Sequence, residues 1–558
     1  MNSLPAPGLP ETPRASGIGR ASALLASGTI VSRILGFVSV AVLAHTLFTQ
    51  NAPANAFTIA NGLPNNIYAI IAGGLLSAIL VPQIVRAGEH ADGGEKFINR
   101  VVTLAIVAFL VIAIAATLCA PLLVNLYAHQ TTDSARGLTP QQIALATAFA
   151  YWCLPQVFFY ALYSLFGEVL NARRVFGPFT WAPVVNNVVA IAGLVTFGLL
   201  FSSVDVTDAA TWSPAMIALI AGSATLGVAA QALFLMFFWR RAGLRYRPEF
   251  RWRGVGLGKV GKAAGWTFAM ILITQLAGIV QSDVASLAGS GQPSNTVLRN
   301  SWLIFMLPHG IVTVSIATAY FTRMSGHASR NDLDSLRHDL TTSLRSIGLV
   351  LVFAAVALIV VAYPFSAVFS TGGGAQTAAM AGVLVPYLVG LIPFSVLFVL
   401  QRTFYALEDT RTPFFFQTFQ SVLFVIGALI AATLHRDQIA MGIAVVTTVA
   451  GFAQTILAAI LLRRRIHGIG GGRILRSYAV FLIALAPAAA VGVALDLALG
   501  AFDGGFAVSG VAAAVVSIVV VGGAMAAVYA GMLVLLRAPE LRALAAPVLR
   551  RIRGTRQP

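Results

Sequence analysis

Residues 240–262 read Arg240-Arg-Ala-Gly-Leu-Arg-Tyr-Arg-Pro-Glu-Phe-Arg-Trp-Arg-Gly-Val-Gly-Leu-Gly-Lys-Val-Gly-Lys262 and hold eight basic residues. The segments on either side, 214–239 and 264–289, are apolar, and each is longer than the roughly 20 residues that a helix needs to cross a bilayer. In membrane proteins, Lys and Arg accumulate in the short loops on the cytoplasmic side. The stretch therefore predicts a cytoplasmic loop between two membrane-spanning helices.

The same alternation of apolar and basic segments runs along the whole chain. With the N-terminus inside, 32 of the 36 Lys and Arg residues fall in cytoplasmic segments and two, Arg136 and Arg436, in outside loops. Arg33 and Arg299 remain, in or at the edge of apolar segments. This split indicates an all-α polytopic membrane protein with both termini cytoplasmic. Its fourteen predicted spans are 21–48, 57–85, 101–128, 140–170, 177–201, 214–239, 264–289, 300–322, 346–366, 377–401, 412–434, 439–462, 477–499 and 507–536.

The composition excludes an ordinary soluble domain, because 58% of the residues are hydrophobic and only 10% are charged. The net charge of +17 is spread over short cytoplasmic segments. Anionic membrane lipids are therefore the expected electrostatic partner, and nucleic acid is not. Both cysteines, Cys119 and Cys153, lie in apolar spans, so neither a disulfide framework nor a metal cluster is expected.

Proline motifs recur at a nearly constant offset. Leu63-Pro64 and Leu307-Pro308 are 244 positions apart, Leu154-Pro155 and Ile392-Pro393 are 238 apart, and two basic turns ending in Pro178 and Pro413 are 235 apart. We infer a six-helix unit that is duplicated. Because six is even, the two copies form parallel repeats about an axis along the membrane normal.

This duplication divides the chain into two lobes and an extra helix pair. The predicted parts are a cytoplasmic tail 1–20, an N-lobe 21–239, a cytoplasmic linker 240–263, a C-lobe 264–465, a pair of helices 466–536 and a basic cytoplasmic tail 537–558. Proline in a helix removes a backbone donor and favours a kink, although membrane helices also tolerate proline without functional reason. Because the prolines recur in both halves, we predict hinges between inward-open and outward-open states at Pro64, Pro155, Pro308 and Pro393.

Arg33 lies well inside an apolar segment, within Val31-Ser-Arg-Ile-Leu-Gly-Phe37. An arginine at the centre of a membrane helix costs roughly 2.5–3.5 kcal/mol on insertion scales, so it should face a cavity or a partner. Snorkelling of the side chain to the interface is the alternative. A planar, always charged guanidinium suits bidentate binding of phosphate. We therefore predict that Arg33, with the adjacent Ser32, binds an anionic headgroup.

Neutral polar residues also form stripes within the apolar segments. Asn61 and Asn65 share a helix face at i, i+4, and Asn187 and Gln275 lie in later spans. Each one alone is more often a packing contact between helices. Together they predict the lining of a water-filled centre between the halves. Asp283 and Arg299 lie near each other in the predicted topology and form either a gate or a simple charge balance.

No sequence pattern indicates catalysis or a bound metal. Asp332-Leu-Asp334 resembles the paired carboxylates of glycosyltransferases, but Asn331 and Asp332 fit better as the start of a short interfacial helix, 332–345. The eight histidines show no metal-ligand spacing. We expect a protein that is not an enzyme and has no cofactor. A coupling ion and the membrane potential are both open as energy sources.

Four motifs together resemble the MurJ/MviN family of lipid II flippases, over about residues 20–535. They are Ser32-Arg-Ile-Leu-Gly-Phe37, Leu63-Pro-Asn65, Phe176-Gly-Pro-Phe-Thr-Trp-Ala-Pro-Val-Val-Asn-Asn187 and Phe305-Met-Leu-Pro-His-Gly310. The resemblance implies fourteen helices, membership of the superfamily of multidrug, oligosaccharidyl-lipid and polysaccharide exporters, and a groove for the polyprenyl tail beside helices 13 and 14. It also implies transport of the undecaprenyl-pyrophosphate-linked peptidoglycan precursor, lipid II, between the leaflets of the bacterial plasma membrane.

The chain departs from the family pattern at several basic positions. Ser39 stands where a second basic residue is common, and Tyr68 and Ala69 replace basic residues in the second span. Leu303 and Met306 stand where an Arg and an acid are usual before the proline of the eighth span. The cavity is therefore expected to be far less cationic. Either Arg33 and neutral donors suffice for a pyrophosphate, which we favour, or the substrate or coupling differs.

These observations predict a lipid II flippase that works by alternating access, without covalent chemistry. A multidrug or other polysaccharide exporter of the same superfamily is the first alternative. A non-transporting scaffold for cell-wall synthesis or division proteins is another, and such proteins are also candidate partners. A polyprenyl-phosphate-processing enzyme would need clustered acids at a membrane face, and only Asp332 and Asp334 are available.

Overall fold

The computed structural model describes residues 15–541 apart from 73–94, 132–135, 173–174, 176, 240, 242–245, 251–260 and 371–372. Every helix or strand element in these residues is helical, and a single isolated bridge joins Gln130 and Leu138. The predicted all-α class is therefore confirmed. The end of the bundle at which the first helix begins is called proximal below, and the opposite end distal.

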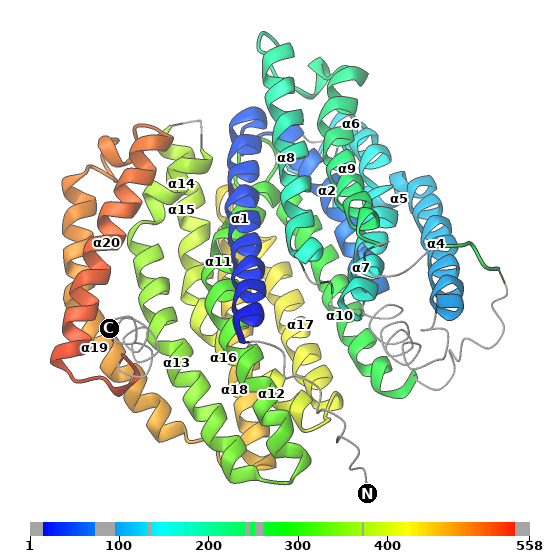
Figure 1. The fold of residues 1–558 in the computed structure, drawn as a ribbon. Coiled ribbons are helices and arrows are strands. Elements are labelled where there is room, and N and C mark those ends of the chain that lie inside the picture. Colours follow the sequence, from blue (N-terminus) through cyan, green and yellow to red (C-terminus); the bar gives the residue numbers. More distant parts are fainter. Residues whose placement is uncertain are drawn as a thin grey trace, which may run out of the picture.

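The helices form two lobes and an outer pair (Figure 1). The N-lobe contains α1 (Ala15–Leu47), α2 (Ala52–Ile71), α4 (Glu95–Leu118), α5 (Ala120–Tyr127), α6 (Pro140–Cys153), α7 (Gln156–Ala172), α8 (Gly177–Leu200) and α9 (Pro214–Phe237). The C-lobe contains α10 (Gly261–Ser286), α11 (Asn295–Pro308), a π-helical turn (His309–Thr313), α12 (Val314–Ser329), α13 (Leu333–Val360), α14 (Ala362–Phe369), α15 (Gly374–Val389), α16 (Leu391–Ala406), α17 (Arg411–Ala431) and α18 (Ile439–Arg465). The pair is α19 (Gly471–Ala498) and α20 (Val511–Leu535).

Thirteen helical segments of the described chain are long and apolar enough to cross a membrane. They coincide one by one with thirteen of the fourteen predicted spans. The remaining span, 57–85, begins within α2, and its residues 73–85 lie outside the described residues. The charge pattern thus predicted the spans correctly.

Several helices begin at an N-cap residue that is recognisable in the sequence. Thr139 accepts a hydrogen bond from the backbone N–H of Gln142 and forms a capping box before α6. Ser213 accepts from the backbone N–H of Met216 at the start of α9. Asp332 accepts from the backbone N–H of Ser335 at the start of α13, and hydrogen bonds from Ser335 hold the pKa of this carboxyl below its usual range. The predicted start is right, but the short interfacial helix is wrong, because α13 continues unbroken into the ninth span.

Breaks recur at equivalent places in the two lobes. The fourth span breaks between α6 and α7 at Leu154-Pro155, and the tenth breaks at Gly390, three residues before Pro393. The third span breaks at Cys119 and the ninth at Val361. Pro308 ends α11 before the π-helical turn, whereas Pro64 lies inside a continuous α2. Three of the four predicted hinge prolines therefore accompany irregular backbone, and their role as hinges stays a prediction.

A threonine from the sixth helix of each lobe satisfies backbone freed at the break in its fourth span. Thr225 of α9 donates to the carbonyl of Trp152, at 2.7 Å, in the last turn of α6. Thr448 of α18 donates to the carbonyl of Pro386, also at 2.7 Å, in the last turn of α15. Carbonyls at a helix end have no partner within the helix, and in lipid each would cost several kcal/mol. The shared arrangement supports the inferred duplication.

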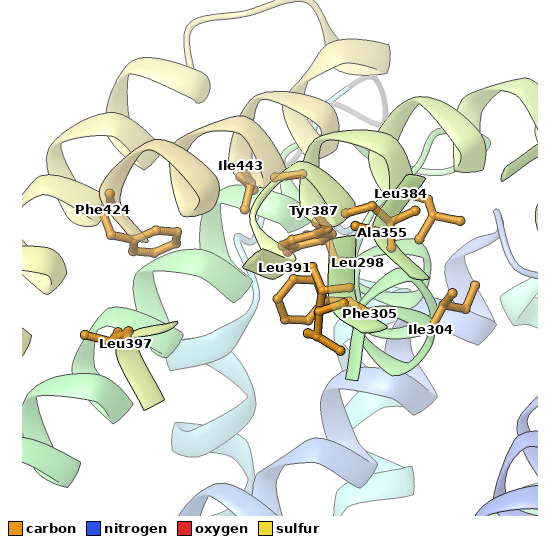
Figure 2. Close-up of a cluster of buried hydrophobic side chains, with 14 of the residues drawn as sticks. Leu298, Ile304, Phe305, Ala355, Leu384, Tyr387, Leu391, Leu397, Phe424 and Ile443 are labelled. Carbon is orange, nitrogen blue, oxygen red and sulfur yellow. The ribbon is translucent and has the colours of Figure 1, made fainter. Parts of the chain in front are cut away.

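The hydrophobic cores follow the lobes. Two clusters of buried side chains lie in the N-lobe, and a large one fills the C-lobe. Figure 2 shows part of the C-lobe cluster, in which Phe305 lies near Tyr387, with ring centroids 6.3 Å apart. A fourth cluster joins α13 to α19 and α20, so the outer pair packs on the C-lobe.

Between α8 and α9, close packing depends on glycine, and this gives a stability prediction. A Cβ on Gly227 would lie against the Asn186 side chain and 2.9 Å from its backbone oxygen, which cannot move aside. A Cβ on Gly222 of the same helix would meet only the Trp152 ring, at 3.5 Å. Gly227→Ala should lower the unfolding temperature of the purified protein, because overpacking costs about 1–3 kcal/mol.

Gly222→Ala is the matched control in this experiment. It should leave the unfolding temperature unchanged or raise it, since alanine is favoured over glycine in a helix by about 1 kcal/mol. Equal unfolding temperatures for the two variants would contradict the packing assigned to α8 and α9.

Candidate substrate cavity

A cavity of about 860 Å³ lies between the two lobes. The N-lobe contributes residues from α2, α5 and α7, and the C-lobe from α10, α11 and α15–α18. Its polar lining consists of Thr58, Asn61, Asn65, Asn66, Tyr127, Tyr160, Thr274, Gln275, Gln281, Ser282, Asn295, Arg299, Tyr387, Gln401, Gln417, Gln420, Ser421, Thr447, Thr448 and Gln454, beside the indole of Trp302. A wall of hydroxyls and amides can bind a polar headgroup within an otherwise apolar bundle.

Arg299 is the one charged side chain among the described residues that line this cavity. It lies in the second turn of α11, and its accessible surface faces the cavity. Across the lobe boundary it lies close enough to Tyr160 of α7 to interact with it electrostatically. A lone guanidinium in a low-dielectric cavity attracts an anion more strongly than the same group in water.

Three of the predicted substrate residues line the cavity. The Gln156 amide donates to the Asn61 oxygen at 3.1 Å, which fixes Asn61 on α2. Gln275 of α10 donates to the backbone oxygen of Asn66 at 2.7 Å, a bond that joins the lobes. Asn65 lies one turn from Asn61 on the same wall. The polar stripes of α2 and α10 therefore meet, as the sequence predicted.

The other three predicted residues lie elsewhere, at the boundary of α1. Asn187 of α8 donates to the backbone oxygen of Ser32 at 3.0 Å and so joins two helices of one lobe. The Arg33 guanidinium lies against Gly310 of the π-helical turn, where a Cβ would fall within 3 Å of its nitrogens. None of the three lines the cavity in this conformation. Their contact with substrate stays a prediction.

Asp283 and Arg299 do not form an ion pair among the described residues. Asp283 instead faces His129, with 3.6 Å between the carboxylate oxygen and Nδ1. The backbone N–H of His129 also donates to the Ser286 hydroxyl at 2.6 Å. Asp283, near the end of α10, and Arg299, near the start of α11, both lie toward the distal end, but Arg299 lines the cavity and Asp283 does not. The proposed pairing is therefore absent here, although Asp283 does contact the opposite lobe.

Most hydrogen bonds that join the lobes within the described chain lie at this distal end. Besides those of His129, they are His45 Nε2 with the Val368 oxygen (2.9 Å), Gln50 with the Gln376 oxygen (3.0 Å), Thr58 with Thr296 (3.0 Å), Ser282 with the Tyr127 oxygen (2.8 Å), and Arg136 with the Ala432 and Leu434 oxygens (3.2 and 2.9 Å). Together they close the lobes against each other distally.

An apolar groove of about 630 Å³ lies beside α1 near the distal end. Its walls come from α1 and α8 of the N-lobe, from Val368 of α14, and from Val511 and Val515 of α20. One helix of the outer pair, α20, therefore borders a groove, and the tail groove that the family resemblance implies beside both helices stays a prediction. The groove also reaches between the two lobes, which was not predicted.

The glutamines of the C-lobe wall were missed in the sequence. Gln417 and Gln420 are three residues apart on α17, Gln454 lies on α18 and Gln401 on α16, all inside apolar spans. The rule that selected Asn61 and Asn65 would also have selected them. Within the described residues, no group of three or more His, Cys, Asp or Glu side chains could hold a metal ion.

Solved structures share this fold. One described as "Lipid II flippase MurJ, inward closed conformation" superposes with a TM-score of 0.65 at 17% identity, over 92% of this chain and 99% of that one. An inward-facing multidrug resistance transporter of the MATE family, in the MOP superfamily, gives 0.60 at 16% identity, over 79% and 96%. Identities this low establish the fold alone.

Sequence relatives are more specific. The probable lipid II flippase MurJ of Haemophilus influenzae is 26% identical over 69% of this chain and 75% of its own length. That of Vibrio cholerae is 25% identical over 84% and 86%. A sequence profile described as "Lipid II flippase MurJ" matches residues 43–517. This chain, with its two lobes around a polar cavity, therefore belongs to the MurJ lipid II flippase family.

Proposed function

We propose that this protein is a lipid II flippase, which moves its lipid-linked substrate across the bilayer by alternating access of the cavity between its lobes. The main observation in support is a polar cavity between the lobes, which hydrogen bonds between the lobes close at the distal end. A transporter of this kind needs no covalent chemistry and no cofactor. A coupling ion and the membrane potential remain the two candidate energy sources.

The orientation of the cycle follows from charge. The basic residues of the turns 323–345 and 463–476 lie at the proximal end, which we take as cytoplasmic by the positive-inside rule. The distal end then faces outward from a bacterial plasma membrane, and anionic lipids would contact the basic loops. In the observed conformation the outward side is closed, so the next step toward release is separation of the lobes distally.

Within the cavity we assign the pyrophosphate to Arg299. It supplies the fixed positive charge that an anionic headgroup needs, and Asn61, Asn65 and Gln275 supply neutral hydrogen bonds. Arg33 is a second candidate, which would need to leave Gly310 to reach the headgroup. The apolar groove beside α20 is the proposed place of the polyprenyl tail, because lipid chains favour an apolar surface that opens between the lobes.

The alternative functions have less support. Multidrug transporters share the fold, but the family match and the named relatives are lipid II flippases. A scaffold without transport does not account for a polar cavity that would be costly to keep in a membrane protein. Cell-wall synthesis and division proteins stay candidate partners.

Reconstitution tests the function directly. Vesicles containing this protein and labelled lipid II in the inner leaflet should expose the label to an external, membrane-impermeant reagent. Vesicles without protein should not, because the charged headgroup crosses a bilayer very slowly. Equal accessibility in the two preparations would contradict the proposed function.

The arginine assignment is tested by Arg299→Ala and Arg299→Lys. Loss of charge-assisted hydrogen bonds worth about 1.5–3 kcal/mol should weaken lipid II binding roughly ten- to a hundredfold in Arg299→Ala, and Arg299→Lys should retain part of the affinity. Binding to purified protein and growth rescue of flippase-depleted cells are the measurements.

Arg33→Ala is assayed beside the Arg299 variants. Full rescue by Arg33→Ala would remove the headgroup role of Arg33. Wild-type binding by Arg299→Ala would contradict the assignment made above.

Distal closure is tested by Thr58→Cys with Thr296→Cys, in a Cys119→Ser background that removes the exposed native thiol. The two hydroxyls are 3.0 Å apart on opposite lobes, so oxidation or a short bis-thiol crosslinker should join the lobes and stop transport. Reduction should restore it. Each single cysteine variant is the control, and undiminished transport by the fully crosslinked protein would show that this end does not open.

A further inference from the structure

Three glutamines on the C-lobe wall form a directional chain of hydrogen bonds. Gln454 of α18 donates to the Gln417 side-chain oxygen at 2.9 Å. Gln417 of α17 donates in turn to the Gln420 side-chain oxygen, also at 2.9 Å. We call these three residues the glutamine relay. All of them line the cavity, and Gln454 is only 4% exposed.

Because the hydrogen bonds of the relay run in one direction, each end of the relay has an amide group without a hydrogen-bond partner. A carboxamide has two N–H donors and an oxygen with two lone pairs. The Gln420 nitrogen has no acceptor among the described residues, and the Gln454 oxygen has no donor. The neighbouring Ser421 hydroxyl is buried, lines the same cavity and has no hydrogen-bond partner either. The wall therefore has a free donor and a free acceptor, with the unpaired Ser421 hydroxyl buried beside them.

Packing between helices explains only part of this arrangement. The bond from Gln454 to Gln417 joins α17 to α18, as amides often do in membrane proteins. Gln420 and Ser421 add nothing to that bond, yet both face the cavity. Unpaired polar groups in such a place cost about 1–3 kcal/mol each, which a polar ligand would recover.

The chemistry of the relay differs from that of Arg299. No charged side chain of the described lining stands on α17 or α18, whereas Arg299 lies on α11 toward the distal end. Uncharged groups that both donate and accept match hydroxyls and carboxamides in both directions, whereas a phosphate can use only their donors. Gln417 and Gln420 lie in the middle part of α17 and Gln454 well inside α18, so the cavity has an anionic-ligand region at Arg299 and a neutral region at the relay.

We propose that the glutamine relay, with Ser421, binds the saccharide of the lipid-linked substrate through its hydroxyl and acetamido groups. This inference rests on the proposed function, and it assigns two parts of the substrate to two regions of the cavity. Arg299 would take the pyrophosphate, and the relay the uncharged sugar. The chain then selects glycosylated polyprenyl pyrophosphates over bare ones.

Binding of two probes to the purified full-length protein tests the proposal. The probes are a polyprenyl pyrophosphate and the same lipid carrying an N-acetylated disaccharide, without peptide. Wild type should bind the glycosylated probe about tenfold more tightly, as expected for one or two net hydrogen bonds of about 1 kcal/mol each. Gln420→Leu and Gln454→Leu should each reduce this preference severalfold while leaving the affinity for the bare lipid unchanged.

Other variants distinguish a loss of saccharide preference from a general loss of lipid binding. Arg299→Ala should weaken binding of both probes and leave their ratio intact. Gln438→Leu, an exposed glutamine in the distal turn before α18, should behave as wild type. The ratio of the two affinities does not depend on the folded fraction, and the unfolding temperature of each variant identifies any that is destabilised.

The outcomes are distinct. A wild-type preference that persists in both Gln420→Leu and Gln454→Leu, or equal wild-type affinity for the two probes, would overturn the saccharide assignment and leave the flippase function standing. Failure of wild type to bind either probe would overturn the proposed function, and the saccharide assignment with it.

Discussion

A backbone inside a bilayer must satisfy its own hydrogen bonds, and the rest of this structure depends on how it does so. Unbroken helices meet the requirement by themselves, but a transporter also needs irregular places that bend or open. Here the fourth span of each lobe breaks, and a threonine from the sixth helix donates to the carbonyl left free: Thr225 to Trp152 and Thr448 to Pro386. Gly390, at the second break, lines the cavity. At the second break the irregular backbone thus lies beside the polar interior, and at both breaks a threonine satisfies it.

The contacts between the lobes are weak enough to break and re-form as the lobes separate. The distal bonds are mostly neutral hydrogen bonds, such as Thr58 to Thr296, each worth about 1 kcal/mol net. By contrast, the hydrophobic clusters lie mostly within single lobes, although Phe37 and Ala44 of α1 pack on the C-lobe cluster. Separation of the lobes would therefore expose little core, while each lobe keeps its own packing. Such a balance suits two states that differ by a few kcal/mol.

Charge and hydropathy in the sequence predicted the spans, because insertion into a bilayer imposes both on the sequence directly. The duplicated lobes were inferred from the recurring proline motifs, which insertion does not require. The site was only partly predictable. Asn61, Asn65 and Gln275 line the cavity because a polar stripe on an apolar helix has few other places to lie. Arg33 does not, since its direction depends on how α1 packs on α8 and on the space left by Gly310, which no local pattern encodes. The ion pair of Asp283 with Arg299 failed for a similar reason: proximity in topology does not fix the helix face.

A cavity with one described cation has a consequence for turnover. A ligand shifts a two-state carrier only by its difference in affinity between the states, and affinity that is equal in both contributes nothing to the cycle. Several fixed arginines would hold a pyrophosphate strongly whichever side was open, and release would be slow. One arginine on α11 together with neutral groups on both lobes gives weaker binding, in which the amide contacts change as the lobes move apart. Gln275 illustrates this, because its bond to the Asn66 oxygen joins α10 to α2 and must break if those helices separate.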